Sequence, residues 1–503
     1  MSSLRLTELC FAYADVPLFV DLTAHLIPGW TGLVGPNGGG KTTLLKLISG
    51  ASAPTGGALR FDPPSPAVAV CPQLVGPLTE AVEAFSWDWS GAAARLRGLL
   101  ALDPAAIERW TTLSPGERKR WQIGAALADA PEVLLLDEPT NHLDAEARGR
   151  LLVALRQYRG LGVLVTHDRG ILDALTDATL WLSPRGWRWH AGPYGEARDR
   201  WSREDAEQLA ALTTAQRDAR RARQRLADGR RDAAAATAKT STRKRMKGPR
   251  DSDARSVAAK GRAAAGAAKR SHAAGRLRRA AERSAASVGD WRPDRVPGRS
   301  LFIDWAPAPR ARLLSLRRDR LCAGEHEVLR EVDVWVDRGA RVHLAGANGS
   351  GKTTLLRALL EGSQLPADRV LWLPQELPPG EGARLLDAAR SLDADVLGRV
   401  MQLAAALGLT PSALLRSEQP SPGEARKLAL AMGLGRQAWL LALDEPTNHL
   451  DLPSVERLEA ALADYPGALV LVSHDDRFAR AVTDQRWLLE GGRVRQSARG
   501  PRR

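Results

Sequence analysis

The fold of this chain is decided by the stretch Gly35-Pro36-Asn37-Gly38-Gly39-Gly40-Lys41-Thr42-Thr43-Leu44-Leu45, which returns as Gly346-Ala347-Asn348-Gly349-Ser350-Gly351-Lys352-Thr353-Thr354-Leu355-Leu356. Both copies match G-x-x-x-x-G-K-[ST], a glycine-rich loop whose backbone N–H groups can surround phosphate groups. The first copy follows the strand-like run Thr31-Gly32-Leu33-Val34, and a helical pattern begins at Thr42. A chance glycine-rich turn could explain one copy, but it does not explain two copies in the same setting.

Three further motifs return in the same order. They are Ser114-Pro115-Gly116-Glu117 and Ser421-Pro422-Gly423-Glu424, then Leu136-Asp137-Glu138-Pro139-Thr140-Asn141-His142-Leu143-Asp144 and Leu443-Asp444-Glu445-Pro446-Thr447-Asn448-His449-Leu450-Asp451, then Thr166-His167-Asp168 and Ser473-His474-Asp475. The copies of these motifs are 307 residues apart, and the two loop lysines are 311 apart. This period is far too long for a solenoid. We therefore predict two copies of one domain, residues 1–195 and 301–503, joined by a linker of residues 196–300.

Each copy is predicted to be an α/β domain with a phosphate-binding loop. Short apolar runs, such as residues 133–136 and 162–165, are typical of parallel strands that are buried on both faces. The phosphate loops follow strands of the same kind and precede helices. The sequence therefore indicates two such domains, joined by a long basic helical linker that resembles a hairpin.

The repeated side chains supply the parts of a nucleotide-hydrolysing site. We expect each loop lysine to reach the β- and γ-phosphates, and the threonine after it to ligate Mg²⁺. The aspartate that ends an apolar run would hold the same metal, and the glutamate after it can orient and polarise the attacking water. These residues are Lys41, Thr42, Asp137 and Glu138 in the first copy, and Lys352, Thr353, Asp444 and Glu445 in the second.

Two more pairs of side chains stand at matching places. A histidine that ends an apolar strand is usually structural, but its position after Asp-Glu-Pro-Thr in both copies favours a contact with the γ-phosphate. A Pro-Gln pair earlier in each copy would contact the metal and the attacking water and report them to the rest of the domain. These catalytic candidates are His167 and Gln73 in the first copy, and His474 and Gln375 in the second.

The segment between the copies has a different composition. Residues 201–300 hold 26 basic and 11 acidic side chains, whereas the rest of the chain holds 46 basic and 47 acidic ones. Its composition predicts helix over residues 197–239 and 253–287, with a basic tip over 240–252. A contact surface for a polyanion, a solvated linker and a disordered segment are all compatible with this pattern. The candidates for RNA contact are Arg243, Lys244, Arg245, Lys247 and Arg250.

Other features of the sequence exclude several classes of protein. No apolar run reaches the ~18 residues that a membrane-spanning helix needs, and the first residues lack the pattern of a signal peptide. We therefore expect a cytoplasmic protein with no transmembrane segment. Cys10, Cys71 and Cys322 are far apart and odd in number, which argues against a disulfide framework and against a cysteine-based zinc or iron–sulfur site.

The order of the motifs resembles that of ATP-binding cassette ATPases. Two cassettes in one chain, the form Asp-Glu-Pro-Thr-Asn-His-Leu-Asp and the basic linker resemble the ABC-F subfamily. The resemblance covers nearly the whole chain and implies ATP and Mg²⁺ as cofactors. It also implies that the ATP-binding residues are Gly35, Pro36, Asn37, Gly38, Gly39, Gly40, Lys41, Thr42 and Thr43 in the first cassette, and Gly346, Ala347, Asn348, Gly349, Ser350, Gly351, Lys352, Thr353 and Thr354 in the second.

The same resemblance implies that the two cassettes pair head to tail within one functional monomer. The signature loop of each cassette would then complete the ATP site of the other. Around Lys41 the signature residues would be Ser421, Gly423 and Glu424. Around Lys352 they would be Ser114, Gly116 and Glu117.

Some residues depart from the pattern of the family. Both signature loops carry a proline, Pro115 and Pro422, where cassettes often have glycine, and this removes one N–H donor. Tyr13 is a candidate for stacking on adenine in the first site, but residues 306–334 contain no aromatic counterpart. The two sites are therefore expected to differ in affinity for nucleotide.

The resemblance further implies a ribosomal partner, with the linker entering near transfer RNA and the peptidyl-transferase region. Residues 244–248 and 251–255 look similar to linkers of members that confer antibiotic resistance. We thus expect a translation-associated ATPase, with ribosome protection against antibiotics as one form of that function. Two other classes stay open, the cytosolic ATP-binding subunit of a transporter and a DNA-acting ATPase.

Overall fold

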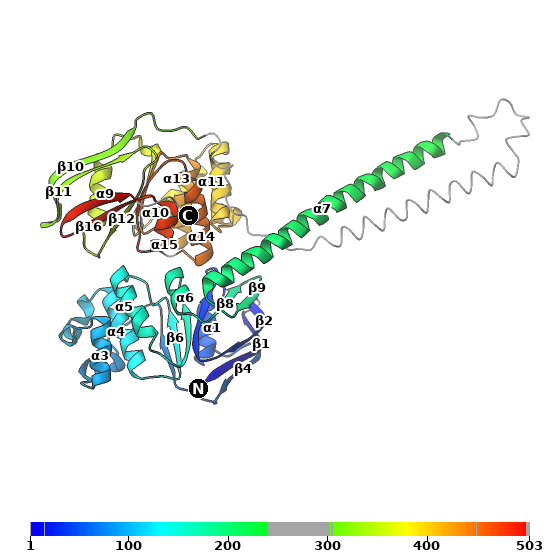
Figure 1. Cartoon of the computed structure of the whole chain (residues 1–503). Coiled ribbons are helices and arrows are strands. Elements are labelled where there is room, and N and C mark those ends of the chain that lie inside the picture. The colour runs from blue at the N-terminus through cyan, green and yellow to red at the C-terminus, as the bar shows by residue number, and fades with distance from the viewer. Residues whose placement is uncertain (1, 15, 240–301, 303–304, 449, 499–503) are drawn as a thin grey trace, which may run out of the picture. The chain divides into compact units, whose positions relative to one another are not determined.

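The computed structural model describes residues 2–14, 16–239, 302, 305–448 and 450–498 (Figure 1). The predicted basic tip, with its candidates for RNA contact, and the predicted helix over residues 253–287 lie outside the described residues. The chain divides into a unit of Met1–Ala197 with Arg295–Arg503, which holds both cassettes, and a unit of Arg198–Asp294.

The first cassette is built on a six-stranded sheet in the order β5-β6-β7-β3-β8-β9. All neighbouring strands are parallel except β8 and β9. Its strands are β3 (Gly29–Val34), β5 (Val68–Cys71), β6 (Val133–Asp137), β7 (Leu161–Val165), β8 (Ala178–Ser183) and β9 (Gly186–His190). Every residue of β6 and β7 is buried, as the unbroken apolar runs predict for central parallel strands.

An antiparallel sheet in the order β2-β1-β4 completes the strands of the first cassette. These strands are β1 (Ser3–Tyr13), β2 (Val16–Leu26) and β4 (Gly56–Asp62). The helices are α1 (Lys41–Ile48), α2 (Glu80–Trp87), α3 (Gly91–Leu100), α4 (Pro115–Ala128), α5 (Ala145–Leu155) and α6 (Arg169–Leu175), with a 3-10 segment η1 (Pro104–Thr112). One face of the parallel sheet packs on α1 and on strands β1 and β2, and the other packs on α4, α5 and α6.

The second cassette repeats the same strand order, β13-β14-β15-β12-β16-β17. Its strands are β10 (Arg312–Ala323), β11 (His326–Asp337), β12 (Arg341–Gly346), β13 (Val370–Leu373), β14 (Leu440–Asp444), β15 (Ala468–Val472), β16 (Gln485–Glu490) and β17 (Arg493–Ala498). Strands β10 and β11 form a separate antiparallel ribbon. Two α/β cassettes with matching sheets confirm the predicted fold class.

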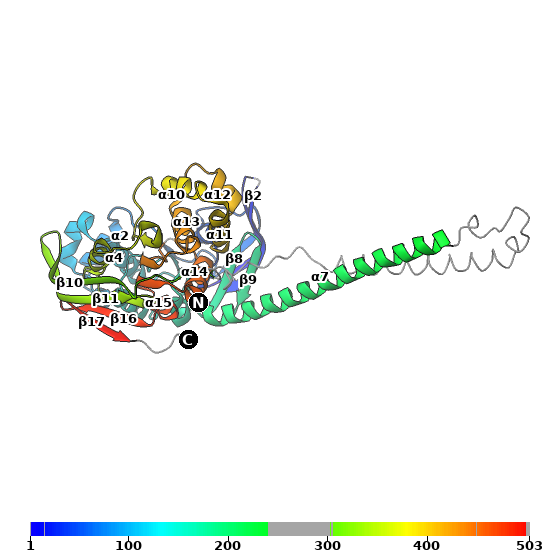
Figure 2. The same cartoon turned by 90° about the horizontal axis from the view of Figure 1, so that it is seen from above.

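Helices of the second cassette form a layer beside its sheet, with α10, α11, α12 and α13 gathered together in Figure 2. The helices are α9 (Lys352–Glu361), α10 (Glu381–Arg390), α11 (Ala394–Ala406), α12 (Pro411–Arg416), α13 (Pro422–Gly435), α14 (Leu452–Asp464) and α15 (Asp476–Val482), with a 3-10 segment η5 (Ala367–Arg369). Helix α9 packs on one face of the sheet. Helices α10 to α15 pack on the other face, against Leu441, Leu443, Leu469 and Leu471, all of which are fully buried. Each such leucine contributes about 1.5–3 kcal/mol by leaving water.

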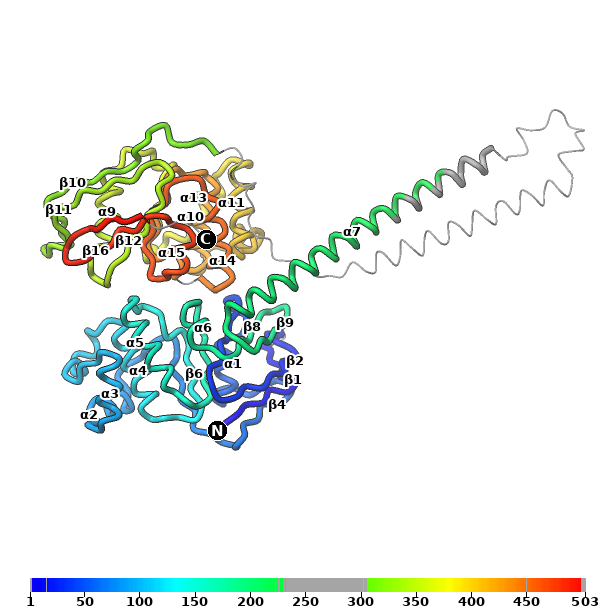
Figure 3. The backbone as a smooth tube through the Cα atoms, viewed as in Figure 1, coloured from blue at the N-terminus to red at the C-terminus, as the bar shows by residue number. Residues whose placement is uncertain are grey.

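Helix α7 (Tyr194–Lys239) follows the first cassette along the chain and is 46 residues long. At 1.5 Å per residue it extends for roughly 70 Å, and Figure 1 draws it as one continuous ribbon. The coloured part of its backbone can also be followed in Figure 3. Residues 197–239 lack proline and are rich in good helix formers, so the predicted helix over this range is confirmed.

Candidate nucleotide site

Each phosphate loop connects the end of a central strand to a helix that begins at the loop lysine, β3 to α1 and β12 to α9. Gly35 lies at φ 142°, and a Cβ atom there would fall 1.9 Å from the carbonyl oxygen of Leu182. The loop lysines turn back onto the loop itself. Lys41 Nζ donates to the carbonyl oxygens of Gly35 at 2.9 Å and Pro36 at 3.0 Å.

The second loop repeats this geometry, because Lys352 Nζ donates to the carbonyl oxygens of Gly346 at 2.9 Å and Ala347 at 2.8 Å. Burial lowers the pKa of both lysines. In each case nearby carboxylates oppose that shift, among them Asp451 at Lys41 and Asp144 at Lys352. Each of these aspartates belongs to the other cassette.

A threonine hydroxyl meets a strand-end carboxylate in both cassettes. Thr42 Oγ1 donates to Asp137 Oδ2 at 3.0 Å, and Thr353 Oγ1 donates to Asp444 Oδ2 at 2.6 Å. Burial raises the pKa of both aspartates. A hydroxyl and a carboxylate held together at the end of a strand are hard oxygen donors of the kind that Mg²⁺ prefers.

The two glutamates have unusual backbone conformations, with φ 48° at Glu138 and φ 47° at Glu445. Positive φ values are uncommon outside glycine and are concentrated at functional sites. The backbone N–H of Glu138 donates to the carbonyl oxygen of Val165 at 2.8 Å, and that of Glu445 to Val472 at 2.9 Å. These bonds join each glutamate to the end of the neighbouring strand.

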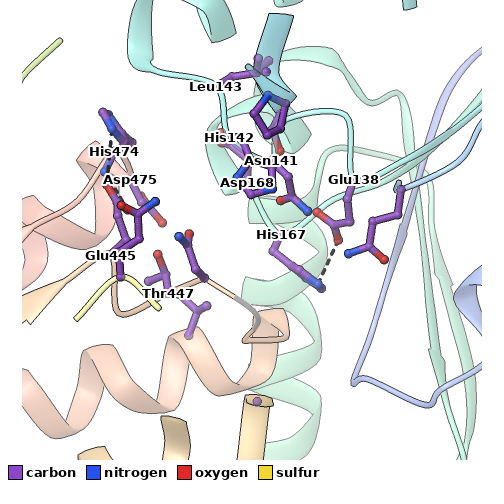
Figure 4. Close-up of a pocket in the computed structure, with 18 of the residues that line it drawn as sticks. Glu138, Asn141, His142, Leu143, His167, Asp168, Glu445, Thr447, His474 and Asp475 are labelled. Carbon is purple, nitrogen blue, oxygen red and sulfur yellow. Dashed lines mark hydrogen bonds and ion pairs between the residues drawn. The ribbon is translucent and has the colours of Figure 1, made fainter. Parts of the chain in front are cut away.

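That neighbouring strand leads to the histidine. Figure 4 shows Glu138 with His167, and Glu445 with His474, as two separate pairs. The distance from His Nε2 to Glu Oε1 is 2.9 Å in the first pair and 3.5 Å in the second. In the second pair the backbone N–H of His474 also donates to Glu445 Oε2 at 3.3 Å.

Burial changes the titration of the second pair. It raises the pKa of Glu445 to about 7, and it lowers the pKa of His474 to about 4. The positive charges of Lys352 and Arg148 add to the shift at His474. Around neutral pH His474 is therefore a neutral imidazole, while Glu445 is close to its midpoint.

The signature loops form the N-terminal ends of helices α4 and α13. Ser114 Oγ accepts from the N–H of Glu117 at 3.2 Å, and Glu117 Oε2 accepts from the N–H of Ser114 at 2.9 Å. Ser421 and Glu424 form the same capping box, with distances of 3.4 and 2.9 Å. Pro115 and Pro422 occupy the first turn of their helices, where the missing N–H breaks no helical hydrogen bond.

Contacts between the cassettes bring the two sets of residues together. The backbone N–H of Asn37 donates to Asp451 Oδ2 at 2.8 Å, so the first phosphate loop contacts the second cassette. Leu452 is fully buried within the core cluster of the first cassette. A cavity of about 1290 Å³ is lined by Lys41, Glu138, His167, Gln73, Ser114 and Gly116 together with Lys352, Glu445, His474, Gln375, Ser421 and Gly423.

Some of the predicted residues lie behind this cavity and do not line it. Gly35, Pro36, Gly346 and Ala347 hold the loop lysines through their carbonyl oxygens. Glu117 and Glu424 complete the capping boxes. Of the predicted ATP-binding residues, Gly39 and Ser350 also lie outside the lining. Tyr13 is part of the lining, and its hydroxyl lies 3.3 Å from Thr43 Oγ1.

Sequence reasoning missed a buried cation on each signature helix. Arg426 donates to the carbonyl oxygens of Gln375 at 2.9 Å, Asp444 at 2.9 Å and Glu445 at 2.6 Å. Lys119 makes the equivalent contacts in the first cassette, to the carbonyl oxygens of Pro72, Gln73 and Asp137. The signal was present in the repeat, because a basic residue follows each signature serine after five positions.

Known proteins are similar to this chain over most of its length. The family model described as ABC transporter matches residues 22–141 and 329–448. The tylosin resistance ATP-binding protein TlrC of Streptomyces fradiae is 31% identical, with 98% of each chain covered. The ribosome protection protein VmlR of Bacillus subtilis is 28% identical, over 97% of this chain and 87% of its own.

A solved structure shares the fold. It is the archaeal ribosome recycling factor aABCE1, in a complex with the archaeal ribosomal stalk protein aP1. The TM-score is 0.61 and the sequences are 18% identical, with 97% of this chain and 89% of that chain covered. None of the helices in the described ranges has both the length and the apolar character that a bilayer crossing requires.

Proposed function

Because this chain belongs to the ABC-F subfamily of ATP-binding cassette ATPases, we propose that it hydrolyses two ATP molecules held between its cassettes and thereby acts on the ribosome. The observation that supports this proposal best is the shared cavity. Both phosphate loops, both glutamate–histidine pairs and both signature loops line it. A reaction centre assembled from two halves lets ATP binding and hydrolysis control closure and opening.

The phosphates would be bound by the two phosphate loops. The backbone N–H groups of the loops would donate to the phosphates. The side chains of Lys41 and Lys352 would turn from the loop carbonyl oxygens toward the same phosphates. The threonine–aspartate pairs and the glutamines, Gln73 and Gln375, would hold Mg²⁺, which neutralises phosphate charge when it is bound. The helix dipoles of α4 and α13 favour a γ-phosphate at their N-terminal ends, where Ser114 and Ser421 stand.

Hydrolysis would use the glutamates as bases. Glu138 or Glu445 orients a water molecule, whose oxygen bonds to the γ-phosphorus while the bond to the β–γ bridging oxygen breaks. The water proton passes to the carboxylate, and ADP and phosphate are the products. A pKa of about 7 suits Glu445 to this role near neutral pH. His167 and His474 hold the glutamates and would contact the γ-phosphate.

A ribosomal partner is supported by the relatives and by the composition of the linker. VmlR is named as a ribosome protection protein, and residues 201–300 carry the whole positive excess of the chain. We place the protein in the cytoplasm, where ribosomes are found. Contact of the linker with RNA phosphates would make binding sensitive to salt.

Protection against an antibiotic is the more specific form of this proposal. It is supported by TlrC, a tylosin resistance protein that matches this chain over nearly its whole length. Expression in a drug-sensitive host should raise the inhibitory concentration of at least one ribosome-targeting drug. Unchanged inhibitory concentrations across a panel of such drugs would reject this form of the function.

The ribosomal assignment is tested with the double variant E138Q/E445Q. Because both catalytic bases are lost, the cassettes should close on ATP and remain closed. The variant should therefore sediment with ribosomes in the presence of ATP and inhibit translation in vitro. The wild type with ADP is the control for sedimentation that does not depend on ATP. If the variant shows no ATP-dependent enrichment on ribosomes, the ribosome is not its partner, and purified membrane fractions and duplex DNA become the next partners to test.

A further inference from the structure

Arg169 is a buried cation that the reaction described above does not use. It begins helix α6 and follows directly after His167 and Asp168, yet its side chain is fully buried against the other cassette. Its Nη2 atom lies 2.5 Å from Oε2 of Glu459 on α14. The same atom lies 3.8 Å from Oδ2 of Asp475, the residue that follows His474.

Asp475 is held from two sides. Its Oδ1 accepts from the N–H of Phe478 at 2.9 Å and so caps helix α15, while its Oδ2 faces Arg169. Its own N–H donates to Ser473 Oγ at 3.1 Å. The loop of residues 473–475 carries His474, so the position of Asp475 determines where the imidazole of the second site stands.

Among the described residues, the repeat places no cation at the equivalent position of the second cassette. The repeat places Asp476 at the position of Arg169, and Asp476 is exposed and bonds to Arg480 of its own helix at 3.1 Å. Similarly, Val455 stands where the first cassette has Arg148. Arg148 lines the shared cavity and bonds to Asp168 at 3.0 Å, beside Arg169. The charge of Arg148 also acts on His474 and Asp475 of the second cassette.

We propose that Arg169 is a positioning residue that acts across the cassettes, holding Asp475 and through it His474 at the second ATP site. The consequence is directional, since the second site depends on a side chain of the first cassette that the first site does not receive in return. This inference rests on the proposed role of Glu445 and His474 in hydrolysis, but it does not depend on the ribosome as partner.

The test measures hydrolysis one site at a time in the full-length chain. The E138Q variant leaves the second site to hydrolyse ATP, and the E445Q variant leaves the first. Adding R169M should lower kcat at the second site about tenfold or more, with little change in KM for ATP, because a misplaced catalytic group slows the chemical step. At the first site kcat should change less than about twofold.

A merely structural role predicts the opposite pattern. Arg169 belongs to the first cassette and lies two residues from His167, so general damage to α6 would harm the first site most. R169K, which keeps the charge, should restore part of the lost kcat. The control is R477Q, which removes another ion pair between the cassettes, Arg477 to Asp173 at 2.6 Å, and should leave both sites within about twofold.

A second variant keeps the test decisive if R169M folds poorly. D475N keeps the cap on α15 but removes the charge that Arg169 faces, so it should lower kcat at the second site to a similar extent. R169M added to D475N should then cost little more, since coupled residues are not additive. Equal losses at both sites, or full activity of D475N at the second site, would overturn the proposal. If H474A has no effect on the second site, the proposed function itself fails there.

Discussion

The backbone N–H of Asn37 lies 2.8 Å from Oδ2 of Asp451 and donates to it, which joins the first phosphate loop to the end of the repeated Asp-Glu-Pro-Thr motif of the second cassette. The reciprocal relationship is electrostatic, because the charge of Asp144 acts on Lys352. Each phosphate loop therefore stands beside an acidic residue of the opposite cassette. Closure of the cassettes therefore acts directly on the groups that would hold the phosphates.

Asp451→Ala should weaken this connection. Asp451 Oδ1 also accepts from the N–H of Ser454 at 3.0 Å and caps α14, so the variant should lose about 1 kcal/mol of folding free energy. ATP hydrolysis should fall about tenfold, because the first loop is no longer held against its partner cassette. Thermal unfolding and steady-state phosphate release measure the two effects.

Ser90→Ala is the matched control for the cap alone. Ser90 Oγ accepts from the N–H of Ala93 at 3.2 Å and caps α3, and Ser90 is not among the residues that line the shared cavity. Its loss should also cost about 1 kcal/mol, with hydrolysis unchanged. Equal hydrolysis by the two variants would show that the bond from Asn37 to Asp451 has no part in the reaction.

Arg426→Met should affect both stability and chemistry at the second site. The guanidinium holds three carbonyl oxygens, those of Gln375, Asp444 and Glu445, and burial lowers its pKa to about 10. Leaving these oxygens without donors should cost about 2–4 kcal/mol of folding free energy. Arg426→Lys should recover only part of the stability, because a single ammonium cannot replace the planar fork. Urea unfolding measures whether Arg426→Lys is more stable than Arg426→Met. Equal stability of the two variants would contradict this account.

Tyr13→Ala should weaken the binding of ATP at the first site only. Tyr13 lines the cavity and its ring is half-exposed, whereas Ala323 lines the cavity in the second cassette. Stacking of a base on an aromatic ring contributes about 1–3 kcal/mol, so the affinity of the first site should fall roughly five- to hundredfold. Binding of a fluorescent ATP analogue to E138Q/E445Q, with and without Y13A, should show one weakened site and one unchanged site. Tyr13→Phe, which keeps the ring, should bind as the parent does.

Much of the fold could be predicted from the sequence, because its strongest signals are local. The apolar runs of β6 and β7 are buried along their whole length, as their composition requires, and helix α7 follows from a proline-free segment of helix formers. The phosphate loops were recognisable because glycine is required where a Cβ would collide with the backbone, as at Gly35. Repetition of each motif added a second, independent observation of the same kind.

The relationships between distant residues could not be predicted in this way. Nothing local to Arg169 indicates that it is buried against Glu459, 290 residues further along the chain, and nothing local to Lys119 indicates the carbonyl oxygens that it holds. Pro115 lacks an N–H donor, but its fit to the local structure could not be predicted from this fact alone. The structure places it in the first turn of α4 within a capping box, where proline fits the helix.

Cys71 should be unreactive in the folded protein, although it lies two residues before Gln73. Its side chain is 1% exposed, and burial raises the pKa of the thiol to about 12. The thiolate is the reactive form, so a thiol reagent at pH 8 should modify the exposed Cys322 and leave Cys71 intact until the chain unfolds. Mass spectrometry of the labelled peptides, with and without denaturant, distinguishes the two cysteines.

The same shift makes folding depend on pH in a definite direction. Above about pH 9 the unfolded chain loses the thiol proton while the folded chain keeps it, so the unfolded state is favoured as the pH rises toward 12. The slope from this group should approach 1.4 kcal/mol for each pH unit, about the value for one proton. In Cys71→Ala this part of the slope should vanish, whereas Cys322→Ala should retain it. Labelling of Cys71 in the native protein as fast as that of Cys322 would show that the loop that carries Gln73 opens to solvent in the free protein. Identical slopes in the two variants would show the same.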